Sequence, residues 1–333
     1  LRLLRDAAKG RDGELTPLGA EQHRQIAERM VRNFPEIFKG KTHVDAKSTV
    51  VIRCILSMEN ALQQLVRMNP NLEITHDASY HDMYYMNHND TLLFKQRMPK
   101  AAREAFDNFS KRHIHPERLM NELFNDSTYW QKEINFKQLY STLFKQASNV
   151  QSTELRHELS LFNLFTDKEL YDLWTTNNAW WYINYGPSPL NGGQQPTSQR
   201  FLLRKIVSEA DSCLMLNHPS VTLRYGHDTM VMPLTCLLDL DGMGVQVADL
   251  EQVTMKGWNN YRIFPMACNL QFVYYRKPGS DDILVKILRN ENEAKLPIAT
   301  DVYPYYHWKD VRAYCLKVAA DRPLVKVGDP IKH

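Results

Sequence analysis

His227 and Asp228 are the residues whose types and position point most directly to chemistry. They follow an apolar and aromatic run, 221–225, and a glycine, Gly226, and they precede a second apolar segment. This pattern predicts a strand, a tight turn and a helix that Asp228 or Thr229 can cap. A helix N-terminus at the carboxyl end of a strand suits an anion such as phosphate, because free N–H groups and the helix dipole point toward it.

Arg53 occupies a similar predicted position. The β-branched run 49–52 predicts a short strand, and Ser57 can cap a helix that runs through Leu65. Arg53 would then lie where a strand ends and a helix is about to begin. A guanidinium there can meet two oxygens of a phosphate with its planar fork. Each feature alone is also compatible with a surface arginine and with a His-Asp pair that only caps a helix.

Composition sets wider bounds. The chain has 333 residues, 43% of them hydrophobic, and a net charge of +3. No run approaches the ~18 apolar residues of a membrane helix, and the charge does not argue for nucleic acid. The five cysteines form no Cys-x-x-Cys pair, so a zinc ribbon is not indicated. Disulfide pairing and oligomeric state stay open.

The other periodic segments predict an α/β protein with a helical insertion. Alternating runs at 269–276 and 282–288, joined by Lys277-Pro-Gly-Ser, predict a hairpin. Helical periodicity dominates from about residue 101 to 210, and Thr166 to Glu169 reads as a capping box. We therefore expect an α/β core from residues 1–78 and 201–333, with a mainly helical insert over 79–200. Pro233 is expected near the first turn of its helix.

A polar stretch between the second predicted strand and this insert offers an alternative kind of site. It contains six residues of metal-ligating type: His76, Asp77, His81, Asp82, His88 and Asp90. The first two histidines are five positions apart, and no His-Glu-x-x-His pattern occurs. A polar loop is the favoured interpretation, and no metal or cofactor is expected. A metal-dependent hydrolase would lose activity with a chelator.

Several motifs together resemble one family. They are His227-Asp-Thr, the Arg53-Cys-x-x-Ser-Met segment, Leu15-Thr-x-x-Gly, Val285 to Glu291, and Trp180-Trp-Tyr-Ile-Asn-Tyr-Gly-Pro-Ser-Pro. This set resembles the histidine acid phosphatases, the branch with phytases, and is most similar to bacterial multiple inositol-polyphosphate phosphatases. The resemblance covers nearly the whole chain. It implies a phosphoglycerate-mutase-like, three-layer core with a mixed, mostly parallel sheet, and a periplasmic or secreted location.

The resemblance also implies roles for particular residues. Arg53 and His227 would bind the phosphoryl group, and Asp228 would be the proton donor in a reaction through a phosphohistidine. The family's nucleophile lies in an Arg-His-Gly stretch, which occurs nowhere in this sequence. Since Leu1 and the residues after it look like the middle of a helix, we expect that stretch upstream. The other possibility is a non-catalytic phosphate-binding protein.

The substrate class is a further expectation. The first half of the insert carries many cationic residues: Lys95, Arg97, Lys100, Arg103, Lys111, Arg112, His113, His115 and Arg118. A solvated helix face explains most of them. A few near the mouth of the site would favour a substrate with many phosphates, such as phytate. A general acid phosphatase acting on sugar or other monophosphates is the alternative. No nucleic acid partner and no membrane span are expected.

Overall fold

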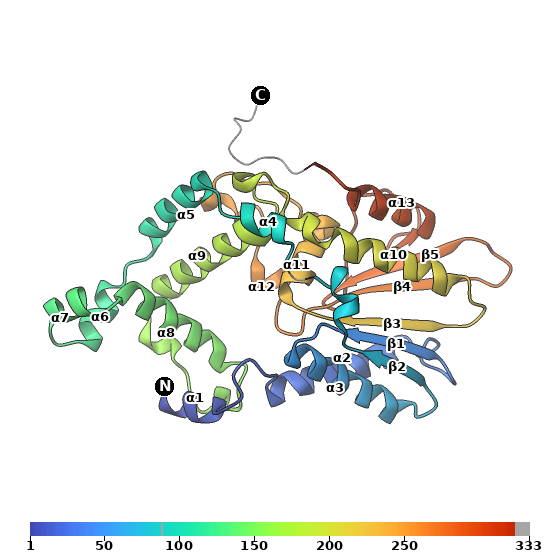
Figure 1. Cartoon of the computed structure of the whole chain (residues 1–333), viewed down its shortest axis with the longest axis horizontal. Coiled ribbons are helices and arrows are strands. Elements are labelled where there is room, and N and C mark those ends of the chain that lie inside the picture. The colour runs from blue at the N-terminus through green and yellow to red at the C-terminus, as the bar shows by residue number, and fades with distance from the viewer. Residues whose placement is uncertain (88, 324–333) are drawn as a thin grey trace.

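The computed structural model describes residues 1–87 and 89–323 and places them in an α/β core with a helical arm (Figure 1). The strands are β1 (His43–Ser48), β2 (Glu73–Asp77), β3 (Ser220–Tyr225), β4 (Leu270–Arg276), β5 (Ile283–Arg289), β6 (Asn292–Glu293) and β7 (Tyr305–His307). The helices of the core are α2 (Pro17–Asn33), α3 (Ile52–Met68), α10 (Arg200–Leu214), α11 (Asp228–Leu237), α12 (Asn260–Ile263) and α13 (Trp308–Val318).

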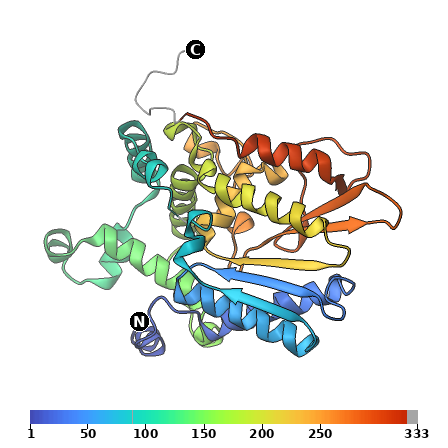
Figure 2. The same ribbon diagram turned by 45° about the vertical axis from the view of Figure 1, so that its right-hand side comes forward.

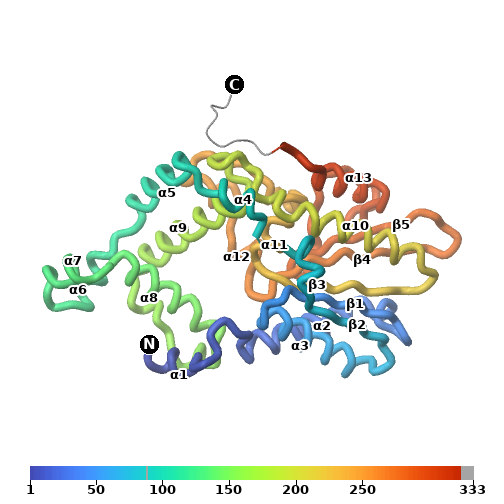
Figure 3. Tube along the Cα trace, in the orientation of Figure 1, coloured from blue at the N-terminus to red at the C-terminus, as the bar shows by residue number. Residues whose placement is uncertain are grey.

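The remaining helices belong to the N-terminus and to the region between β2 and α10. They are α1 (Arg2–Ala8), α4 (Thr91–Gln96), α5 (Lys100–His113), α6 (Glu117–Leu123), α7 (Ser127–Glu133), α8 (Phe136–Val150) and α9 (Asp167–Tyr185). The tube in Figure 3 shows α5 to α8 projecting away from the strands. Leu119, Trp130, Tyr140, Leu143 and Phe165 give this arm an apolar cluster of its own.

The strands form two sheets. β1 lies between β2 and β3 and is parallel to both, with Ser48 opposite Tyr225 in the register with β3. β4 and β5 form an antiparallel hairpin, and β5 also pairs with β6 and β7. Figure 2 shows the two sheets side by side, with β3 and β4 at their adjacent edges. The α/β fold class and the predicted hairpin are thus confirmed.

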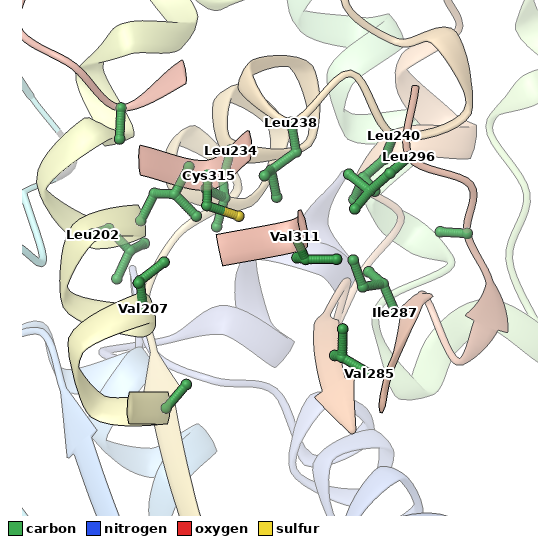
Figure 4. Packing of buried hydrophobic residues seen from close by; sticks show 14 of the residues in the cluster. Leu202, Val207, Leu234, Leu238, Leu240, Val285, Ile287, Leu296, Val311 and Cys315 are labelled. Carbon is green, nitrogen blue, oxygen red and sulfur yellow. The ribbon is translucent and has the colours of Figure 1, made fainter. Parts of the chain in front are cut away.

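Helices cover both faces of the strands, which gives the three layers. α2 and α3 pack on one face, where Val44 and Ala46 of β1 meet Met58 and Leu65 of α3. The hairpin, α10, α11 and α13 share the other large cluster, in which Val207, Leu234 and Val311 pack with Val285 and Ile287 (Figure 4). Burial of this apolar surface holds the strand ends in place.

Residues 79–200 are not one uniform insert. Tyr85 and Met86 join the cluster of the α/β core, and Ala102, Tyr182 and Ile183 pack with Met232 of α11. The expected domain boundaries therefore remain a prediction. The capping box is confirmed, since the Thr166 side chain accepts from the Glu169 N–H and the Glu169 carboxylate accepts from the Thr166 N–H.

Several local predictions were wrong. The run 49–52 is not a strand: β1 ends at Ser48, and α3 begins at Ile52. The alternating burial of β1 sets the strand earlier, and tertiary packing outweighs the β-preference of the valines. Ser57 is therefore inside α3, where its hydroxyl donates to the Arg53 carbonyl. Pro233 is the sixth residue of α11 rather than part of its first turn.

Candidate functional site

The candidate site lies where β1 and β3 end. Both strands run in the same direction, so their carboxyl ends meet at one edge of the sheet. α3 begins shortly after β1, and α11 begins at Asp228, with His227 between it and Gly226. A Cβ on Gly226 would lie 2.6 Å from Sδ of Met230, so a larger residue here would require that flexible side chain to shift. The two helix N-termini bring Arg53 and His227 to the same place.

His227 is the centre of the site and is buried. Its Nδ1 lies 3.4 Å from Nη2 of Arg53, and its Nε2 lies 3.2 Å from Oγ1 of Thr49. The Sγ atom of Cys54 is 3.8 Å from both ring nitrogens. The imidazole is therefore held on several sides by Thr49 of the β1–α3 connection and by residues in the first turn of α3.

Asp228 is the first residue of α11, and the N-cap position belongs to His227. One of its carboxylate oxygens accepts from the Thr229 N–H at 2.8 Å. Burial raises the pKa of Asp228, although the Thr229 N–H and the charge of Arg53 act in the opposite direction. The residue keeps a solvent-accessible surface, so a ligand can reach a carboxyl that binds its proton more tightly than usual.

Arg53 is exposed and sits in the first turn of α3. Its guanidinium contacts Nδ1 of His227. Among the residues that the structure describes, it forms no ion pair with a carboxylate, and its charge acts on Asp228 only through space. An exposed cation without a carboxylate partner can bind an anion at little cost in broken contacts.

The three site residues predicted from the sequence are thus brought together. The arrangement supplies a positive guanidinium, an imidazole, two helix N-termini and a carboxyl with a raised pKa. These groups can bind an oxyanion and give it, or a group attached to it, a proton. Within residues 1–87 and 89–323, no three His, Cys, Asp or Glu side chains lie close enough to hold a metal ion.

The alternative metal site does not assemble in the described part of the chain. His76 is on β2, and its Nδ1 pairs with the Glu59 carboxylate at 2.8 Å, while His81 lies in the 3₁₀ helix Tyr80–Tyr84. Asp82 is buried and faces Lys47 at 3.5 Å. His88 lies outside the described residues. These residues therefore have separate roles.

Two residues of the site were missed by the sequence analysis. Thr49 and Cys54 are both buried and both contact His227. They lie on either side of Ile52, where α3 begins, but the sequence analysis placed the helix start at Ser57, beyond both. Nothing local distinguishes a threonine that contacts a histidine 178 positions away from one that fills a strand end.

A sequence profile of the histidine phosphatase superfamily (branch 2) matches residues 8–290. The chain belongs to this superfamily. The match spans β1, α3, β3 and α11, and therefore includes every residue of the site described above. No match was found among curated proteins.

Solved structures share the fold. The Bifidobacterium longum multiple inositol polyphosphate phosphatase in complex with inositol hexasulfate superposes with a TM-score of 0.65 at 17% identity, over 91% of this chain and 79% of that one. Its apo form gives 0.66 at 18% identity, over 94% and 81%. The phytase from D. castellii gives 0.66 at 12% identity, over 94% and 68%. At these identities the likeness shows a common fold.

Two further findings bear on cellular context. No helix in residues 1–87 and 89–323 combines the length and apolar character needed to cross a bilayer. The five cysteines are free thiols, three of them buried.

Proposed function

We propose that this protein is a phosphomonoester hydrolase that works through a phosphohistidine and acts on inositol polyphosphates such as phytate. The observation that carries the proposal is the meeting of Arg53, His227 and Asp228 at two helix N-termini. The superfamily supports a phosphatase. The neighbour bound to inositol hexasulfate supports the choice of substrate, since a hexasulfate carries an anionic group at each position where a hexaphosphate does.

The chemistry follows from the groups present. A histidine nitrogen attacks phosphorus in line, so that a P–N bond forms while the P–O bond to the leaving alcohol breaks. Arg53 and a protonated His227 offset the charge on the phosphoryl oxygens. Asp228 gives its proton to the leaving alkoxide and then takes a proton from the water that breaks the P–N bond. The raised pKa of Asp228 favours the protonated form that the first step needs.

The nucleophile is not among the residues at the site, and we propose that a segment preceding Leu1 supplies it. The support is the arrangement of the two sheets. Within the described chain, β3 has no partner on the side away from β1, and β4 has none on the side away from β5. These two edges are adjacent in both ribbon views (Figures 1 and 2). A strand between them would deliver a residue beside His227 and join the sheets into one.

Trapping the intermediate tests this proposal. The protein with its natural upstream sequence is mixed with ³²P-labelled substrate and quenched in base, in which phosphohistidine survives. We expect label on one histidine of the upstream segment, and loss of label when that histidine is changed to alanine. Turnover without any labelled protein would contradict the phosphohistidine route.

The substrate proposal has its own test. We expect a higher kcat/KM for phytate than for a sugar monophosphate at low ionic strength, because cations outside the phosphoryl site attract the extra phosphates. The ratio should fall as the Debye length shrinks from ~30 Å at 0.01 M to ~10 Å at 0.1 M salt. A ratio near one throughout would favour a general acid phosphatase.

The insert supplies fewer free cations than its composition suggests. Arg112 pairs with Glu251 at 2.9 Å, and Arg118 pairs with Glu169 at 2.5 Å. The preference for phytate therefore rests on the remaining cations of the insert. A periplasmic or secreted location is part of the same proposal, and it rests on the resemblance to phytases.

A non-catalytic phosphate-binding protein is the second candidate, because the sequence contains no Arg-His-Gly stretch. Calorimetric titration of the chain with inorganic phosphate tests the phosphate site that both candidates share. Binding is expected for either. A phosphatase gains turnover once the natural upstream sequence is restored, whereas a binding protein does not.

A further inference from the structure

His227 is held by a row of buried side chains. Thr49 is fully buried, and its Oγ1 lies 3.2 Å from Nε2 of His227. The Cys54 thiol lies 3.8 Å from the imidazole nitrogens and donates to the Gly226 carbonyl at 3.1 Å. Because these contacts are shielded from water, each donor depends on its protein partner.

The backbone fixes the positions of these residues. The Thr49 N–H donates to the Tyr225 carbonyl at 3.0 Å, which continues the ladder between β1 and β3 by one residue. Thr49 and His227 therefore come from neighbouring strand ends held in one register. The side chain at position 49 faces the imidazole whatever its type, so what matters is whether it carries a hydroxyl.

The hydrogen bonds have one possible direction when the imidazole is neutral. The Arg53 guanidinium has donors only, so Nδ1 of His227 must accept from it. The ring proton then sits on Nε2 and is donated to Thr49. The Thr49 hydroxyl donates a hydrogen bond to Sγ of Cys54, and the thiol in turn donates to the Gly226 carbonyl, which can only accept. Burial raises the pKa of Cys54, which keeps it a thiol donor.

We propose that Thr49 and Cys54 are positioning residues that hold His227 in the tautomer with its proton on Nε2 and direct Nδ1 toward the anion beside Arg53. The proposal rests on the proposed function only for the identity of that anion as a phosphoryl group. Neither residue touches it, and both act through His227.

The fixed tautomer determines how the phosphoryl group is received. When the Arg53 guanidinium turns from Nδ1 to the phosphate oxygens, the lone pair of Nδ1 faces those oxygens too, so a proton must lie between Nδ1 and the phosphate. That proton comes from solvent, which makes His227 an imidazolium, or from a monoanionic phosphate that donates to Nδ1. In either case Nε2 keeps its bond to Thr49, so the ring does not turn over on binding and little reorganisation is needed.

The test compares Thr49→Val, which keeps the shape and removes the hydroxyl, with Thr49→Ser, which keeps the hydroxyl. The ring nitrogens of His227 are observed by NMR in ¹⁵N-histidine-labelled chain, assigned by their loss in His227→Gln, and inorganic phosphate is titrated into each variant. Wild type and Thr49→Ser should show the Nε2–H tautomer. In Thr49→Val the buried Nε2–H loses its acceptor, and the exposed Arg53 can turn away from Nδ1, so this variant should show a mixture of tautomers. It should bind phosphate about three- to tenfold more weakly.

Thr235→Val is the matched control. Thr235 is as buried as Thr49, but its hydroxyl donates to the Val231 carbonyl inside α11 at 2.8 Å. This variant should leave the tautomer and the affinity for phosphate unchanged. If Thr49→Val does not fold, as judged by thermal melting, Cys54→Ala interrupts the same chain one bond further on and should also give a mixture of tautomers.

An unchanged tautomer in Thr49→Val, or in Cys54→Ala where that variant is used, would overturn the proposal. The outcome is separable from the proposed function. A changed tautomer in a protein that never hydrolyses phosphate esters would leave the positioning intact in a binding site. Full turnover with an unchanged tautomer would leave the phosphatase intact and remove this role for Thr49.

Discussion

Asp228 and Asp172 are two aspartates whose pKa values are shifted in opposite directions. Burial acts to raise the pKa of both carboxyls. For Asp172, on α9 next to the helical arm, hydrogen bonds from His113 at 2.9 Å and Lys168 at 2.5 Å outweigh burial, and the pKa is lowered. Asp228, at the sheet end, has only a backbone N–H and the distant charge of Arg53, so its pKa stays raised.

The arginines of the two regions differ in the same way. Arg118 of the arm bonds Glu169 with two nitrogens, at 2.8 and 2.5 Å, and also bonds Glu122 and the Leu164 carbonyl. Arg53 faces the His227 imidazole and no carboxylate among the described residues. Ion pairs thus satisfy the charge of Arg118, whereas Arg53 at the sheet end is left to meet a ligand. The number of cations in a segment does not reveal this difference.

Replacing Asp228 should have the largest effect. In the protein with its natural upstream sequence, Asp228→Asn should slow hydrolysis of alkyl phosphates by roughly 10²–10⁴, the usual contribution of a general acid. Esters with an acidic leaving group need no proton and should be much less affected. Steady-state kinetics with both ester types measures this. Equal losses would show that Asp228 is not the proton donor.

The pH dependence of kcat should also report on Asp228 as the proton donor. Because the pKa of Asp228 is raised, the proton donor stays loaded above the ordinary range of an aspartate, and kcat for alkyl esters should fall as pH rises through the raised value. In Asp228→Asn this limb of the profile should disappear. If kcat of the variant still falls with rising pH in the same range, another group gives the proton to the leaving alkoxide.

Arg53→Lys should have the next largest effect. The charge is kept, but the planar fork that meets two oxygens is lost, so inhibition by inorganic phosphate should weaken about tenfold. The free energy of unfolding should hardly change, since the guanidinium is exposed. An inhibition constant equal to that of the wild type would remove Arg53 from the site.

Arg118→Met should show the opposite pattern to Arg53→Lys, with lower stability and unchanged affinity for phosphate. It leaves Glu169 largely buried without its charged partner, so the free energy of unfolding should drop by about 2 kcal/mol, as measured in urea. Affinity for phosphate should stay the same. Arg112→Met is the control, because its pair with Glu251 is more exposed and should contribute at most about 1 kcal/mol. Weaker phosphate binding in Arg118→Met would show that the arm contributes to the phosphate site.

Local sequence patterns predicted much of this structure. The capping box at Thr166, the hairpin after residue 269 and the strand–turn–helix around His227 all have strong short-range signals. The β-branched run 49–52 was wrongly predicted to be a strand, because tertiary packing decides where β1 ends. The contacts of Thr49 and Cys54 with His227 join positions more than 170 residues apart, and only the folded sheet brings them together.

The smallest expected effect concerns His23, which belongs to the sheet-end region and has no ion pair in the described chain. Its ring packs edge-on against Tyr225 with 6.0 Å between centroids, and burial lowers its pKa to about 4. The unfolded chain binds this proton near the ordinary value of 6.5, so acid favours unfolding between those two values. At pH 5.5, His23 should cost about 1 kcal/mol relative to pH 7. His23→Phe keeps a ring against Tyr225 and cannot titrate. Urea unfolding at both pH values should show a pH-dependent loss smaller by that amount. An identical loss in the variant would mean that the His23 ring takes up its proton without unfolding, and that this end of the sheet admits charge more easily than its burial implies.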